Sequence, residues 1–293
     1  MKYSRNKLEE YSEKISETEK IQCENAIDMV KDALKDYGYR ISQSKLNFSD
    51  DGYAYYYKMN DNSFGNLTVI VQGSYANNTN IRRYSDVDIS VVYSSLFSTS
   101  LENQFYEFKS KVFNALRDKF GSDVIRKNKS IRVKGNTNRK SIDVVAAFAI
   151  GNKIENGIQF LTDDGIKIVN YPLKQIKNEN EKHRDTNYYF KKYVRILKNI
   201  KEDMLEHGYL SASKIGSFQV ESLLWNLNNS LFNTYSSIGY GINNLISTLK
   251  SCKCLLYSYK ESNGIKPLCK NEEVESNLKM FISDITDFFE FEG

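Results

Sequence analysis

The hydrophobic pattern of the chain changes about halfway along. In the first half, short apolar runs with a period of two alternate with helical stretches, whereas the second half has helical apolar spacing almost throughout. We therefore expect an α+β first half built around a small mixed sheet, followed by a helical second half. The predicted domains are 1–175 and 176–293.

The same pattern predicts individual elements. In the first half it indicates helices over 4–38 and 101–120, and a loop or short hairpin over 43–66. Strands are predicted over 67–71, 87–93, 124–126, 130–134, 141–148 and 158–161. In the second half, apolar positions at helical spacing predict helices over 183–204, 212–232, 243–259 and 272–289.

The most informative segment is a predicted strand that ends in Gly73-Ser74, with Asp86 and Asp88 on the next strand. Gly73 lets the backbone approach a ligand closely because it has no Cβ, and a turn into a helix offers N–H groups to a phosphate. Asp86 and Asp88 are two residues apart and project from one face. At about 7 Å they cannot share a proton, but they can bracket hard cations bound to a triphosphate.

A third carboxylate, Asp143, lies in the otherwise apolar strand 141–148. Burial of an unpaired carboxylate costs several kcal/mol, so Asp143 needs a cation or a set of donors. Each feature also has a purely structural interpretation: Gly-Ser as a simple turn, Asp-x-Asp as a solvated edge, and Asp143 as a hairpin cap or as a partner of Arg132 or Arg139. Their combination in this order predicts a two-metal phosphoryl-transfer site.

Composition excludes several other chemistries. The 293 residues include 41 Lys+Arg and 37 Asp+Glu, and a net charge of +4 is too small to indicate nucleic-acid binding. With 2 His and 4 Cys, unevenly spaced, the chain offers no zinc-hydrolase set, no Ser-His-Asp triad and no disulfide framework. Glycine-rich nucleotide motifs are absent from the sequence. No apolar run approaches the ~20 residues of a membrane span, and no secretory leader is evident, so we expect a cytoplasmic protein.

A known signature matches the segment QGSYANNTNIRRYSDVDISVVY, residues 72–93. It resembles the polymerase-β-type nucleotidyltransferase pattern hG[GS] followed by [DE]h[DE]h, and KSIDVVAAF resembles the strand of that fold with the third carboxylate. Gln72, Thr79 and the IDVV-A-F strand narrow the resemblance to the bacterial CD-NTases, the cGAS/DncV-like enzymes of anti-phage defence. The resemblance extends over about 65–232. One departure is Ala146, where many relatives have Pro.

The resemblance implies a polymerase-β-like nucleotidyltransferase core with a C-terminal helical lobe. It assigns Asp86, Asp88 and Asp143 to catalysis and to two Mg²⁺ ions, with Mn²⁺ as an alternative metal. The implied nucleotide-binding residues are Gln72, Gly73, Ser74, Lys198, Ser217 and Phe218. Lys198 and Ser217 would reach phosphates and Phe218 would stack on a base, whereas the structural alternatives are a solvated helix charge for Lys198 and a helix N-cap for Ser217.

The implied activity is condensation of NTP substrates into a cyclic di- or oligonucleotide second messenger, with release of pyrophosphate, in CBASS-type anti-phage defence. A downstream effector would sense the product. Two alternatives stay open: a nucleotidyltransferase that modifies tRNA, a protein or a small molecule, and a nucleotide-binding regulatory module. The basic segment 126–140 lacks interleaved aromatics, so we expect no nucleic-acid activator. We also expect a monomer without membrane contact, and the sequence leaves the bases, ring size and linkage open.

Overall fold

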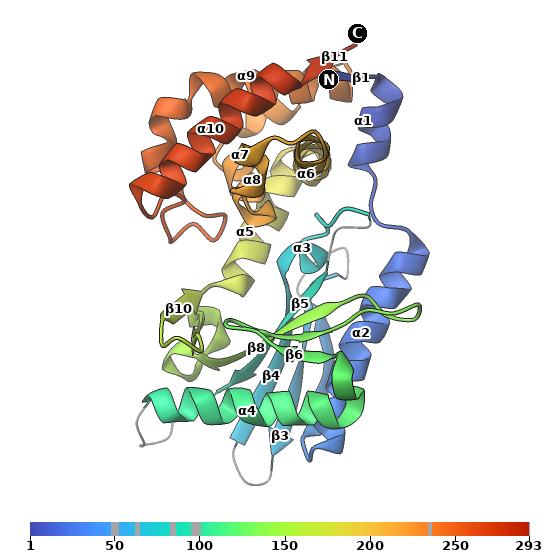
Figure 1. The fold of residues 1–293 in the computed structure, drawn as a ribbon, viewed down its shortest axis with the longest axis vertical. Coiled ribbons are helices and arrows are strands. Elements are labelled where there is room, and N and C mark those ends of the chain that lie inside the picture. Colours follow the sequence, from blue (N-terminus) through green and yellow to red (C-terminus); the bar gives the residue numbers. More distant parts are fainter. Residues whose placement is uncertain (48–52, 62–64, 83–85, 95–100, 234–235, 293) are drawn as a thin grey trace. The chain divides into compact units, whose positions relative to one another are not determined.

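The structure is a computed structural model that describes residues 1–47, 53–61, 65–82, 86–94, 101–233 and 236–292 (Figure 1). The chain forms two compact units. The sheet unit contains residues 15–78 and 82–176, and the helical unit contains residues 1–14, 79–81 and 177–293. Besides the residues that follow Ile176, the helical unit therefore includes two short earlier segments, 1–14 and 79–81.

The sheet unit is built on one mixed sheet, which has nine strands in the described residues. The strand order is β10-β9-β8-β5-β4-β3-β2, and the β6–β7 hairpin joins through β7 to β8. β5 and β8 are parallel, and the other pairs are antiparallel. The bounds are β2 Arg40–Asn47, β3 Tyr55–Asp61, β4 Gly65–Gln72, β5 Val87–Tyr93, β6 Val124–Arg126, β7 Ile131–Val133, β8 Ile142–Ala149, β9 Ile158–Leu161 and β10 Lys167–Asn170.

Two long helices, α2 (Glu17–Asp36) and α4 (Leu101–Phe120), contact each other and pack on the sheet (Figure 1). Apolar residues of both helices share one core with alternate residues of the central strands, for example Ile142 and Val144 of β8. Because side chains alternate along a strand, Asp143 between them points to the opposite face. The unit also contains α3 (Gly73–Ala76) and 3-10 turns at Gly121–Asp123, Ile150–Asn152 and Ile154–Asn156.

The helical unit is arranged around α6 (Phe190–Glu206), which contacts most of the other helices and is buried along much of its length. The other helices are α1 Arg5–Ser12, α5 Pro172–Asp185, α7 Leu210–Ser213, α8 Ser217–Trp225, α9 Ile238–Ser251 and α10 Glu272–Phe288, with 3-10 turns at Asn229–Phe232 and Lys253–Ser258. Two short strands, β1 (Lys2–Tyr3) and β11 (Glu290–Phe291), pair in parallel and join the ends of the chain. None of the helices described is long and apolar enough to cross a membrane.

The predicted fold class is confirmed, and several strands and helices fall where the pattern places them. β5, β9 and α4 have the predicted bounds, and the hairpin alternative for 43–66 is right for the described residues of β2 and β3. The prediction of one helix over 4–38 is wrong. The chain breaks between α1 and α2, where Ser16 and Glu19 form a capping box that starts α2.

The predicted helices of the second half are also divided. The helix expected over 183–204 is the end of α5 and most of α6, separated by Asn187 and Tyr188 in the left-handed region with φ of 47° and 64°. The segment 212–232 contains the end of α7, then α8 and a 3-10 turn. The prediction over 272–289 agrees with α10 to within one residue.

Candidate active site

Four polar side chains form a row across neighbouring strands of the sheet. Gln72 of β4 lies opposite Asp88 of β5, Asp88 opposite Asp143 of β8, and Asp143 opposite Arg132 of β7. Residues in register project from the same face, and adjacent strands are about 4.8 Å apart. Asp86 stands two residues before Asp88, at the entrance to β5. The sheet therefore brings the three predicted carboxylates to one face.

Gly73 packs directly against this row. It follows β4 and has a φ of +68°, a conformation that favours glycine. A Cβ at this position would overlap the Asp88 carboxylate and lie 3.0 Å from the Asp88 Cβ. Gln72 is held beside them, because its Oε1 accepts a hydrogen bond from Ser90 Oγ at 2.9 Å. Ser74 is half-buried on the short helix α3. The Gly-Ser turn and Asp88 thus form one local arrangement.

The β6–β7 hairpin supplies cations to the carboxylates. Lys127 Nζ lies 3.2 Å from Asp143 Oδ1, and Ser130 Oγ donates to the same oxygen at 3.2 Å. Arg132 forms an ion pair with Asp86, and its Nη2 is 3.7 Å from Asp143 Oδ2. The alternative that Asp143 pairs with Arg132 is therefore realised, and Lys127 adds a contact that the sequence did not reveal.

The donor set suits a hard divalent cation. Asp86, Asp88 and Asp143 offer carboxylate oxygens on one face, which are the ligands that Mg²⁺ prefers. In the described part of the chain, however, no three acidic, His or Cys side chains are gathered closely enough to hold an ion in their present orientations. Asp86 and Asp143 instead contact cations of the hairpin. To hold one ion together, the three carboxylates would have to rotate their side chains away from these contacts.

Most of the basic segment 126–140 is neutralised within the sheet unit. Besides the contacts above, Arg126 pairs with Asp163, Arg139 with Asp123, and Lys140 with Glu19. Most of the positive charge of this segment is therefore balanced by carboxylates of the same unit.

Lys198 is deeply buried in the helical unit. Its side chain is 2% exposed, and its Nζ donates to Thr79 O at 2.9 Å and pairs with Glu221 of α8. The Thr79 hydroxyl also donates to Glu221 Oε1 at 2.5 Å. This burial excludes the solvated-charge interpretation of Lys198. Sequence reasoning missed Glu221, although its place inside the apolar helix α8 is a signal that a buried carboxylate needs a cation.

Ser217 and Phe218 stand at the first turn of α8. Ser217 is exposed and Phe218 is half-buried. Gly216 is the N-cap, and its N–H donates to Gln219 Oε1 at 2.8 Å, so Ser217 is not the cap that the structural alternative proposed. The hydroxyl of Ser217 therefore does not serve as the helix cap.

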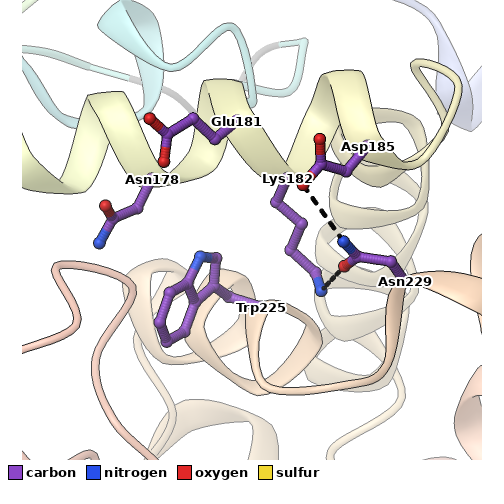
Figure 2. Close-up of a pocket in the computed structure, with 6 residues that line it drawn as sticks. All are labelled: Asn178, Glu181, Lys182, Asp185, Trp225 and Asn229. Carbon is purple, nitrogen blue, oxygen red and sulfur yellow. Dashed lines mark hydrogen bonds between the residues drawn. The ribbon is translucent and has the colours of Figure 1, made fainter.

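A cavity of about 220 Å³ lies within the helical unit (Figure 2). It is lined by Asn178, Glu181, Lys182, Asp185, Trp225 and Asn229, and none of the sequence-predicted site residues. Figure 2 shows Lys182 directed to Asn229, and its Nζ donates to Asn229 Oδ1 at 2.7 Å and to Leu227 O at 2.6 Å. Burial lowers the pKa of Lys182 to about 8, and nearby Asp185 opposes that shift. Lys182 thus ties α5 to the segment after α8.

Comparison with known proteins identifies the family. The model for the cGAS/DncV-like nucleotidyltransferase C-terminal helical domain matches residues 177–290. The cyclic GMP-AMP synthase CdnE03 of Staphylococcus schleiferi is 36% identical to the chain over 319 aligned positions, which cover 100% of this chain and 98% of the relative. The chain is a CD-NTase.

Other CD-NTases agree with this assignment. The cyclic dipyrimidine nucleotide synthase CdnE of Cecembia lonarensis is 34% identical over 256 residues, covering 80% of this chain and 79% of the relative. Among solved structures, the CdnE cyclic dinucleotide synthase of Elizabethkingia meningoseptica with GTP and Apcpp has a TM-score of 0.77 and 28% identity, covering 98% of each chain. This CD-NTase therefore has the nucleotidyltransferase fold over its full described length.

Proposed function

We propose that this CD-NTase condenses NTPs into a cyclic di- or oligonucleotide and releases pyrophosphate at each step. The observation that carries the proposal is the register of Asp88 with Asp143, with Gly73 packed against Asp88. Similarity to synthases of cyclic GMP-AMP and of cyclic dipyrimidine nucleotides supports it. Assignment to a CBASS-type anti-phage system with a product-sensing effector follows from the family resemblance.

Asp86, Asp88 and Asp143 would hold two Mg²⁺ ions, or Mn²⁺ in their place. When bound, such ions neutralise triphosphate charge and lower the pKa of an attacking hydroxyl. The chain's own part is to orient the reactants. We assign Asp143 to placing the acceptor ribose hydroxyl and receiving its proton, since it is the carboxylate farthest across the row from the Gly-Ser turn.

The Gly73-Ser74 turn would hold the terminal phosphates. The absence of a Cβ at Gly73 lets the turn pack directly against the Asp88 carboxylate, and the N–H groups and hydroxyl of the turn would donate hydrogen bonds to phosphate oxygens. Gln72 would keep its side chain aligned through the Ser90 hydrogen bond. These residues bind and orient the donor nucleotide but do not transfer protons.

The family resemblance also assigns nucleotide binding to three residues of the helical unit. Ser217, exposed at the start of α8, would donate to a phosphate, and Phe218 would stack on a base through its ring without a hydroxyl to hydrogen-bond. Lys198 would contact a phosphate only if its ammonium leaves Glu221.

The activity can be tested with all four α-³²P-labelled NTPs and Mg²⁺ or Mn²⁺, followed by phosphatase treatment and product separation. We expect phosphatase-resistant label from the wild-type protein and none from Asp88→Asn or Asp143→Asn. Asp118→Asn, on the exposed surface of α4, is the matched control and should behave as wild type. Omitting NTPs singly then names the bases. Label transferred to an added tRNA or protein instead of a small product would contradict the proposal.

A further inference from the structure

The cations of the β6–β7 hairpin contact the carboxylates that the proposed chemistry needs. Lys127 approaches Asp143, and Arg132 pairs with Asp86 and approaches Asp143. These pairs are partly open to solvent, with side-chain exposures of 38% for Lys127, 27% for Arg132 and 20% for Asp143. Ion pairs that are this exposed contribute little to stability and can be exchanged.

A buried lysine of α4 holds the backbone of the hairpin turn through hydrogen bonds to its carbonyl groups. Lys109 of α4 donates to Lys127 O at 2.8 Å, to Asn128 O at 2.8 Å and to Asp163 Oδ1 at 2.9 Å. An ammonium has three N–H donors, so Lys109 has an acceptor for each of them. Asp163 Oδ1 also accepts a hydrogen bond from Arg126 Nη2 of the same hairpin at 3.0 Å. The position from which the Lys127 side chain extends is therefore fixed, whereas its ammonium remains exchangeable.

Arg132 is held less completely than Lys109. Its contacts to the carboxylates are made through Nη2, while its Nε is buried without a hydrogen-bond acceptor. A buried N–H without a partner raises the free energy of that conformation. The guanidinium of Arg132 can therefore lower its free energy by leaving this conformation when a divalent cation takes the carboxylates or a better acceptor is present.

We propose that Lys127 and Arg132 are internal counter-ions of the catalytic carboxylates, which a divalent cation must displace before it can bind. The proposal rests on the proposed function, since only a metal-dependent transfer requires the exchange. Once displaced, the two side chains can turn to the triphosphate that arrives with the metal, and a guanidinium binds phosphate oxygens in a bidentate manner. The protein would thereby bind free metal less tightly than metal that arrives in complex with a nucleotide.

The proposal predicts the sign of a change in metal affinity. Removal of a competing cation leaves its carboxylate available, so Mn²⁺ should bind the nucleotide-free protein more tightly. For a partly exposed ion pair we expect about three- to fivefold tighter binding in Lys127→Met and in Arg132→Met, and about tenfold in the double variant. If only the loss of a positive charge mattered, the gain in Mn²⁺ affinity would be smaller, and it would be the same for a lysine that does not contact the carboxylates.

The test is titration of nucleotide-free protein with Mn²⁺, followed by electron paramagnetic resonance of the free ion. Lys129→Met is the matched control, because Lys129 is an exposed lysine in the same turn and its substitution removes the same charge. We expect its dissociation constant to stay within twofold of wild type. Circular dichroism confirms folding, and Lys127→Met tests the proposal independently if Arg132→Met is poorly folded.

A second arm adds a non-hydrolysable NTP analogue. If Arg132 turns to the triphosphate, wild type should gain more Mn²⁺ affinity from the analogue than Arg132→Met does. Equal Mn²⁺ affinities in Lys127→Met, Arg132→Met and Lys129→Met would overturn the counter-ion proposal and leave the proposed function intact. Absence of Mn²⁺ binding in every protein, with or without analogue, would overturn the metal site itself and the counter-ion proposal with it.

Discussion

The buried contact between Lys198 and Glu221 allows a quantitative prediction. Their side chains are 2% and 3% exposed, so each charge depends on the other and on Thr79. Removal of one member of such a pair typically costs about 3–5 kcal/mol, because it leaves a charge buried without its counter-charge. Lys198→Met should fall near the lower end, about 3 kcal/mol, since the Thr79 hydroxyl still donates to Glu221.

The double variant Lys198→Met/Glu221→Met removes both charges and keeps the volume. Replacing a buried ion pair by apolar side chains is often neutral, so we expect it to lie within about 1 kcal/mol of wild type. With single losses of about 3 kcal/mol or more, the coupling energy of the double-mutant cycle should then be about 5 kcal/mol or more.

Urea unfolding followed by tryptophan fluorescence suits this measurement. The chain has a single Trp, Trp225, which lies on α8 four residues after Glu221 and therefore reports on the helix concerned. A loss below 1 kcal/mol for Lys198→Met, or a loss in the double variant equal to the sum of the single ones, would refute the reasoning. A tenfold raised KM for NTP in the stable double variant would assign the Lys198–Glu221 pair a part in nucleotide binding as well as in stability.

Three further predictions follow from single side chains. Gly73→Ala should lower product formation more than about 100-fold, because its Cβ would displace the Asp88 carboxylate, while thermal unfolding detects a cost of about 1–2 kcal/mol from the positive φ. The pKa of Lys182 is lowered to about 8 in the folded state, so the unfolded state binds more protons above pH 8. In urea unfolding, the stability of wild type relative to Lys182→Met should therefore rise by about 2 kcal/mol between pH 8 and pH 10. A stability difference that does not change with pH would contradict this. Gly241→Ala should destabilise by about 1–3 kcal/mol in the same assay, since its Cβ would overlap the buried hydroxyl of Tyr193.

Local pattern was sufficient for the centre of the sheet unit. The Gly-Ser turn directly follows the apolar run of β4, and Asp88 lies within the apolar run of β5, so period-two burial and motif spacing place Gly73 and Asp88 without knowledge of distant contacts. The division between α1 and α2 was also readable, from Ser16 followed three residues later by Glu19, but the apolar stripe on both sides obscured it.

The electrostatic partners were not readable in the same way. Which cation faces Asp143 depends on the β7–β8 register, in which Arg132 lies opposite Asp143, and a shift of one residue would turn Arg132 to the other face. Lys127 approaches the same carboxylate from a turn whose shape is set by Lys109 of α4. Glu221 of α8 contacts Lys198 of α6, and α7 lies between these two helices in the chain. Such contacts depend on tertiary packing, which spacing along one strand or helix does not encode.

The division of the chain into non-contiguous segments has a consequence for how the protein can be cut and recombined. The helical unit contains β1, whose partner β11 lies at the other end of the chain, and Tyr3 and Tyr11, whose hydroxyls both donate to Asp203 at 2.8 Å. A fragment that starts at residue 177 would lack these tyrosines and Thr79 as well. A chimera that exchanges the C-terminal half between relatives would therefore have to exchange the first 14 residues and the 79–81 loop together with it.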